Sequence, residues 1–145
     1  MSKSNSLEND LLKLLFNATA IADLAADDQS TPATNLYVSL HTGDPGETGN
    51  QSTNETAYTG YARVAVARTS GGWTVTNNSV SPAANIDFGE CTASPGNPIT
   101  YFGLGTNSTA GQAGYLMYSG TVSPNITMAV GVIPRLKTTS TITED

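Results

Sequence analysis

The chain has 145 residues, which suits one domain, and carries a net charge of −6 with only 12% charged residues, against about 25% in typical globular domains. Its six basic residues are scattered and form no patch that could neutralise phosphates, which argues against binding to nucleic acid or to an anionic membrane surface. The single cysteine, Cys91, rules out an intrachain disulfide and a CxxC redox motif. Polarity comes instead from Ser, Thr, Asn and Gly, a surface that can contact another protein without desolvating many ions.

The first part of the chain has helical periodicity. Apolar residues recur at helical spacing from Leu7 to Ala22, and Asn5 followed by Glu8 is typical of a capping box. We predict a helical segment over residues 1–33, with one helix of about three turns and then a second short one. Such a helix either packs on its own domain or grips a neighbouring subunit. The apolar run "LLKLLF" is too short to span a membrane, so we expect a mature intracellular product.

The rest of the chain, residues 34–145, has the pattern of short β-strands. Residues 36–41 alternate apolar and polar side chains, which predicts a half-buried strand, and a polar loop follows over residues 43–60. About eight strands with turn signals at intervals of roughly 8–15 residues predict a mainly β fold, an antiparallel, jelly-roll-like β-sandwich. The further predicted strands are 61–68, 73–77, 85–88, 99–105, 114–122, 125–130, 132–136 and 139–143.

His41, Asp44 and Glu47 could suggest a metal or acid–base site. The chain has no second histidine, and a metal site would need more ligands than these. The run Asp44-Pro45-Gly46 instead has the chemistry of a type II turn, with Gly46 at positive φ. We therefore predict a strand that ends in a turn, without a metal.

No catalytic or cofactor-binding motif is evident elsewhere. Cys91 has only His41 as a possible base, about 50 residues away, so we expect a small buried or semi-buried thiol. The glycine-rich run 101–114 has no nearby lysine and is followed by a strand, which predicts a hairpin with a mobile tip and no phosphate site. Asp87 and Glu90 are too close in sequence for the two carboxylates of a glycosidase. We therefore expect a non-enzymatic protein without a cofactor.

Aromatic residues recur in the predicted strands and loops. They suit a core or a subunit interface, or else a face that binds sugars. These residues are Tyr37, Tyr58, Tyr61, Trp73, Tyr101, Tyr115 and Tyr118.

The order of several segments resembles a known family, the small virion proteins of tailed bacteriophages. The N-terminal "LENDLLKLLF" is followed by "LYVSLHTGDPGETG" and "TNETAYTGYARVAV", and these give the most specific part of the resemblance. The later segments are "IDFGECTASPG", "ITYFGLGTNSTAGQAGYLMYSGTV" and "ITMAVGVIPRL". Many members are labelled tail fiber protein, and similar ones are capsid decoration, or cement, proteins.

The resemblance implies a virion structural protein. A fibre needs length from repeats or coiled coil, which this chain lacks, so we expect a cement protein on the outer capsid surface. It would bind the major capsid protein as a homotrimer and stabilise the shell by bridging neighbouring subunits. The alternative is a tail fibre or tail-tip module that binds a host surface glycan. The candidate contacts with the capsid or with another subunit are Leu7, Leu11, Leu15, Asp44, Glu47, Asn54, Glu55, Tyr58, Arg63 and Arg68.

Overall fold

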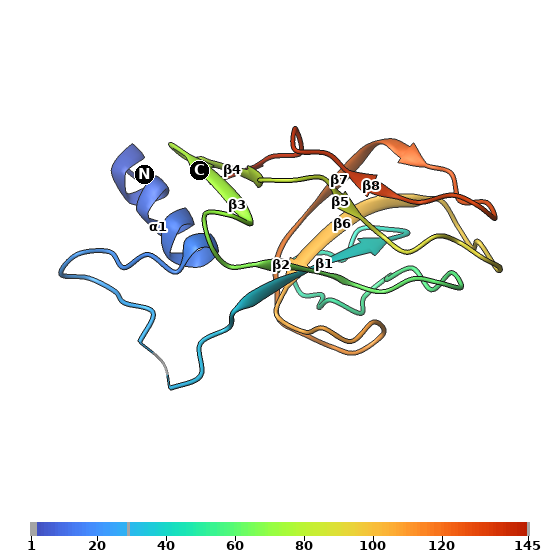
Figure 1. Cartoon of the computed structure of the whole chain (residues 1–145), viewed down its shortest axis with the longest axis horizontal. Coiled ribbons are helices and arrows are strands. Elements are labelled where there is room, and N and C mark those ends of the chain that lie inside the picture. The colour runs from blue at the N-terminus through green and yellow to red at the C-terminus, as the bar shows by residue number, and fades with distance from the viewer. Residues whose placement is uncertain (1–2, 29, 145) are drawn as a thin grey trace. The chain divides into compact units, whose positions relative to one another are not determined.

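The computed structural model describes residues 3–28 and 30–144 and consists mainly of β-strands, with an α-helix near the N-terminus (Figure 1). The pairs β1–β6, β6–β7, β3–β4 and β4–β9 are antiparallel. The predicted class, mainly β and sandwich-like with an N-terminal helix, is confirmed. In chain order the elements are α1 (Asn5–Asn17), β1 (Asn35–His41), β2 (Val64–Ala67), β3 (Trp73–Thr76), β4 (Ser79–Pro82), β5 (Ile86–Asp87), β6 (Ile99–Gly105), β7 (Leu116–Ile126), β8 (Arg135–Leu136) and β9 (Ile142–Thr143).

The chain divides into two compact units, each made of separate stretches of sequence. Unit 1 comprises Met1–Asn35, Val66–Ile86 and Leu136–Asp145, and unit 2 comprises Leu36–Ala65 and Asp87–Arg135. The predicted boundary between residues 33 and 34 lies close to the first crossing of the chain from unit 1 to unit 2. The later crossings carry no shift in composition that sequence reasoning could use. The boundary as predicted from sequence stays a prediction.

Helix α1 in unit 1 begins one residue earlier than the capping box suggests. Ser4, and not Asn5, is the N-cap, and its side-chain oxygen accepts a hydrogen bond of 3.3 Å from the backbone N–H of Leu7. The helix ends at Asn17, before Ala18 in the left-handed conformation. The prediction of a second short helix is wrong, because residues 21–25 form a turn closed by a bridge between Ile21 and Ala25.

The core of unit 1 forms where α1 packs against the β3–β4 hairpin. Leu12 and Phe16 are fully buried, and the rings of Phe16 and Trp73 meet edge to face at 5.0 Å between centroids. Such pairs of rings add about 0.5–1.5 kcal/mol to the burial of their surface. This packing makes the apolar face of α1 part of its own unit.

Strand β4 is an element that sequence reasoning missed. It pairs with β3 across a two-residue turn, with Thr76 opposite Ser79, and with β9 through Val80 and Ile142. Asn77 has a φ of 55°, a conformation that asparagine tolerates in hairpin turns. The pair Asn77-Asn78, between two runs of alternating polar and apolar residues, was the sequence signal for this hairpin turn.

Strand β1 lies between β2 and β6 in a four-stranded sheet, with β7 beside β6, and most residues of this sheet belong to unit 2. Strand β1 is buried on both faces from Val38 to His41, so the prediction of a half-buried strand is wrong there. The two strands predicted at 114–122 and 125–130 are instead a single strand, β7, which has a register shift between its pairs with Ile99 and Tyr101. Strands β5 and β8 pair with each other in a separate two-stranded sheet.

Candidate functional site

His41 is enclosed in unit 2 and makes two internal hydrogen bonds. Its Nδ1 lies 2.8 Å from the carbonyl oxygen of Thr53, and its Nε2 lies 2.9 Å from the hydroxyl of Ser39. Because a carbonyl only accepts, Nδ1 carries the proton and Nε2 accepts from Ser39. Burial lowers the pKa of His41, and the hydrogen bond to Thr53 partly opposes this shift. A fully covered, neutral imidazole is a structural group that links β1 to the following loop.

Arg63 and Glu55 form an ion pair inside unit 2. The Arg63 guanidinium donates from Nε and Nη2 to the two Glu55 carboxylate oxygens, at 2.7 and 2.8 Å. The same guanidinium donates to the carbonyls of Asn107 and Gln112, and Glu55 also accepts from the Gly111 N–H, each at 2.8–2.9 Å. The two side chains are 0% and 3% exposed. The pair therefore fixes the β6–β7 connection, which sequence reasoning expected to be mobile.

Tyr61 extends this network, and the ring of Tyr58 lies 5.4 Å from that of Tyr61 between centroids. Tyr61 donates its hydroxyl to Glu55 at 2.8 Å, and Tyr58 donates to the carbonyl of Gly89 at 2.8 Å. Burial raises the pKa of Tyr61, and burial together with nearby Cys91 raises the pKa of Tyr58 to about 12. Both hydroxyls stay protonated at neutral pH and act as donors.

Gln51 is a buried polar residue that sequence reasoning missed. Its side-chain nitrogen donates to the carbonyl of Tyr37 at 3.2 Å, and its oxygen accepts from the N–H of Asn107 at 2.8 Å. A Cβ atom at Gly105 or Gly114 would lie within 2.6 Å of its amide, so glycines give it room. Gln51 therefore anchors the polar loop over residues 43–60 to the core of unit 2.

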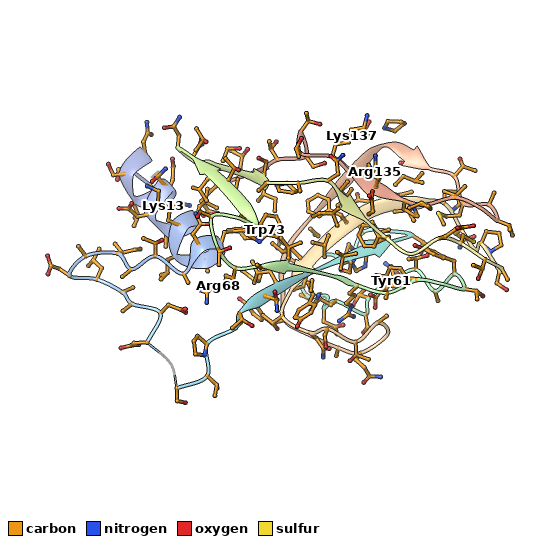
Figure 2. The ribbon with its side chains drawn as sticks, viewed as in Figure 1. Lys13, Tyr61, Arg68, Trp73, Arg135 and Lys137 are labelled. Atoms are coloured by element: carbon orange, nitrogen blue, oxygen red, sulfur yellow. The ribbon has the colours of Figure 1, made fainter. Side chains whose placement is uncertain are left out.

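Arg68 holds the C-terminus of α1 in unit 1 (Figure 2). Its guanidinium donates to the carbonyls of Leu14 and Leu15 at 2.7 Å each, and to Asp27 Oδ1 at 2.8 Å. The last carbonyls of a helix lack partners within it, and α1 has no basic residue in its last turn. A residue more than 50 positions later supplies this cap, which no local pattern could predict.

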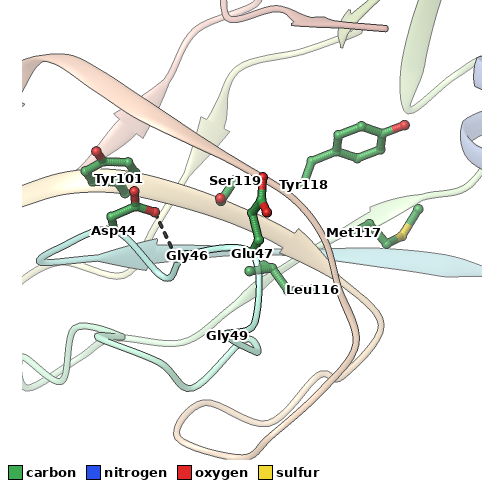
Figure 3. A pocket seen from close by; sticks show the side chains of 9 residues that line it. All are labelled: Asp44, Gly46, Glu47, Gly49, Tyr101, Leu116, Met117, Tyr118 and Ser119. Atoms are coloured by element: carbon green, nitrogen blue, oxygen red, sulfur yellow. Dashed lines mark hydrogen bonds between the residues drawn. The ribbon is translucent and has the colours of Figure 1, made fainter. Parts of the chain in front are cut away.

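An open groove of about 490 Å³ lies on unit 2, between the loop that starts at Asp44 and strands β6 and β7 (Figure 3). The side chains of Asp44 and Glu47 stand on the loop, and Tyr101 of β6 also lines the groove. The Gly46 N–H donates to Asp44 Oδ1 at 2.8 Å, and Gly46 has a φ of 69°, as the predicted turn requires. The groove combines a carboxylate pair with an aromatic ring.

The predicted contact residues fall into two groups. Bonds to other residues of their own units engage four of them: Glu55, Tyr58, Arg63 and Arg68. Leu7, Asp44, Glu47 and Asn54 are exposed, and Leu11 and Leu15 are partly exposed.

The aromatic residues divide in the same way. Tyr58 and Trp73 are buried, whereas Tyr115 is 74% exposed on the β6–β7 connection. The buried rings of Tyr58 and Trp73 therefore cannot belong to a surface that binds sugars. Cys91 is fully buried, as expected.

Two kinds of special site are absent from residues 3–28 and 30–144. No group of three or more His, Cys, Asp or Glu side chains is arranged to hold a metal ion. No helix in the same residues has the length and apolar character needed to cross a membrane.

Comparison with protein families gives one match across the chain. Residues 2–143 match the family described as Podophage GP4 fiber I protein gp80. No curated protein matches the sequence. The resemblance to small virion proteins of tailed phages is confirmed. Since the match covers almost the whole chain, the protein belongs to the Podophage GP4 fiber I protein gp80 family, a family of phage virion structural proteins.

Proposed function

We propose that this protein is a small structural subunit of a phage fibre assembly. The observation that carries the proposal is the match of residues 2–143 to a family described as a fiber protein. The proposed role is structural and not enzymatic. In line with it, the polar side chains that suggested chemistry, such as His41 and Glu55, make hydrogen bonds inside unit 2.

A chain of this length reaches fibre dimensions only by assembling with other subunits. Exposed apolar side chains supply contacts for that assembly: in unit 2, Tyr115, Val130 and Ile133 are 74%, 66% and 53% exposed. In unit 1, Leu7 on the outer side of α1 is 36% exposed. Covering the exposed apolar surface of such side chains contributes roughly 25 cal/mol per Å². A homotrimer with closed symmetry is part of the proposal.

Capsid decoration is the second candidate. The sequence has no repeat or heptad pattern, and each unit is compact, which suits a cap over capsid subunits. In this role a homotrimer on the outer capsid surface would bridge major capsid proteins and stabilise the assembled lattice by mass action. The exposed loop residues Asp44, Glu47 and Asn54 would then face the shell.

The copy number per virion separates the two candidates. Quantitative mass spectrometry of purified virions is expected to give about three to eighteen copies for a fibre subunit, following the symmetry of a tail. Hundreds of copies per virion would contradict the fibre proposal and support capsid decoration. Absence from purified virions would refute both roles.

Binding of a host glycan is a separate property of a fibre module. Purified protein on a glycan array, compared with the Tyr115→Ala variant, tests it, because Tyr115 is the most exposed tyrosine of unit 2. Saturable binding that this substitution removes would assign the host contact to the β6–β7 connection.

A further inference from the structure

Strand β7 forms an outer edge of the four-stranded sheet (Figure 1). Its one neighbour in the described sheets is β6, so the backbone N–H and C=O groups on its other side face no strand. All 11 residues of β7 are exposed or partly exposed, whereas β6 beside it buries Ile99 and residues 103–105. An edge of this kind offers backbone hydrogen bonds to a strand from another chain.

The length of β7 sets it apart from the other edge strands of the described sheets. Those strands, β2, β3, β5, β8 and β9, have two to four residues each. In addition, β2 lies between Arg63 and Arg68, and an ion pair of Asp87 with Arg135 joins β5 and β8. Short strands and charged side chains protect a sheet edge from pairing with other chains. Strand β7 is long, and the stretch 91–134 that contains it has no charged residue and no histidine.

Two irregularities limit the part of β7 that can pair with a further strand. Pro124 has no backbone N–H to donate, and the register with β6 shifts on both sides of residues 118–121. Between these shifts the two strands keep a regular register, from Tyr118 opposite Leu104 to Thr121 opposite Tyr101. The part of the edge that is available for pairing is therefore centred on residues 118–121.

We propose that two copies of this chain pair β7 with β7, antiparallel around a two-fold axis that passes within residues 118–121. Such a contact is isologous, because each copy offers and receives the same backbone groups, and it closes after two copies. An identical strand also matches this edge in length and in its lack of charge. The inference rests on the proposed role as an assembling subunit and names one contact of that assembly. The proposed homotrimer would use other surfaces.

Charge favours this edge over other surfaces as a contact between copies. Each copy has a net charge of −6, so two copies repel each other, and the stretch 91–134 lets them meet without facing charges on the paired strands. Asp44 and Glu47 lie across the groove beside β7 and oppose the approach, so salt should strengthen the pairing. A contact along one strand is small against the about 1,200–2,000 Å² of a stable interface, so the pair should dissociate on dilution.

The first test locates the contact in the purified protein. Hydrogen exchange is measured by mass spectrometry in a dilute and in a concentrated sample. Exchange at amides of residues 117–122 is expected to slow at least fivefold in the concentrated sample, because alternate N–H groups of an edge strand point outward. Unchanged exchange there, or slowing confined to another segment such as 129–133, would overturn the proposal.

The second test measures association of two matched variants by sedimentation equilibrium. Thr121 on β7 and Thr74 on β3 are both exposed threonines of edge strands, so their replacement by lysine changes the net charge equally. Thr121→Lys should raise the dissociation constant of the dimer at least tenfold, because like charges meet across the axis. Thr74→Lys should leave it within twofold. Circular dichroism of both variants should match that of the parent protein.

Three results of this second test would overturn the proposal. They are a monomer at every concentration and salt, an equal effect of the two substitutions, and association that weakens as salt rises. All of these measurements use the purified protein. A copy number in virions that refutes the fibre role therefore leaves them readable.

Discussion

Arg63 donates two hydrogen bonds to Glu55 across eight residues of sequence, and both side chains are closed off from solvent. The pair also binds three backbone groups of the β6–β7 connection. The polar loop over residues 43–60 and the β6–β7 connection are therefore bonded to each other in unit 2. Charged residues are few in this chain, and here two of them stabilise the interior of unit 2.

Replacing Glu55 by glutamine should destabilise the protein by about 3–5 kcal/mol, because it leaves the Arg63 charge buried without its counterion. Glutamine keeps one oxygen that can accept from Tyr61 or Gly111, and its NH₂ group faces other donors of the same network, so the change removes the charge and two acceptor contacts. Urea unfolding followed by circular dichroism measures the difference in free energy of unfolding.

The matched control for this prediction is the exposed ion pair between Asp87 and Arg135. There the carboxylate is solvated, and Asp87→Asn should change stability far less than Glu55→Gln. If the two substitutions have equal effects, the buried pair does not stabilise unit 2 in the way described.

The sequence predicted the fold class because its periodicities are local. The apolar spacing of α1 and the alternation in β1 and β6 are visible within short windows, and the structure has strands at those places. The division into two discontinuous units could not be predicted, because it depends on which distant segments pack together. Strand β4 was missed since Val80 is its one large apolar residue and Pro82 ends it.

The candidate site was harder to predict, because burial of polar residues is decided by partners far along the chain. Arginine side chains are usually exposed, but Arg63 and Arg68 donate to acceptors inside the protein. Some of these acceptors lie more than 40 residues away in the sequence. Asp44 and Glu47, on a loop with its own turn chemistry, are exposed in the structure, and their role as contact residues stays a prediction. Local signals located the loop, and only the structure located its partners.

Arg68→Ala should fray the end of α1 by removing the cap on its last carbonyls. Hydrogen bonds to a charged donor contribute about 1.5–3 kcal/mol, so a loss of that order in unfolding free energy is expected. Hydrogen exchange should speed up at the amides of residues 14–19. Arg68→Lys should recover little, since one ammonium group cannot reach both carbonyls and Asp27 in the geometry of the guanidinium fork. Full rescue by lysine would contradict the capping role.

Gly103→Ala should destabilise unit 2 by about 1–3 kcal/mol through overpacking. An added Cβ would lie 2.5 Å from His41 Nε2 and 2.7 Å from the Ser39 hydroxyl, and both side chains are fully buried. Gly71→Ala is the matched control, because its Cβ would be 3.6 Å from the nearest atom, an ordinary contact. Thermal melts of the two variants should separate by several degrees, and equal melting temperatures would contradict the close packing around His41.

The protein should become less stable as the pH falls, because His41 becomes protonated. Burial lowers the pKa of His41 in the folded state below the ordinary value of 6.5, so the unfolded chain binds a proton first as the pH drops. The stabilisation from neutral His41 is therefore complete above about pH 7.5 and declines below about pH 6.5, until the folded-state pKa is passed. Melting temperatures measured between pH 8 and pH 5.5 should show this decline, at values where Asp and Glu are still largely ionised. His41→Gln should be less stable at every pH but should lose most of the slope in that range. A variant that keeps the full slope would assign the pH dependence to other groups.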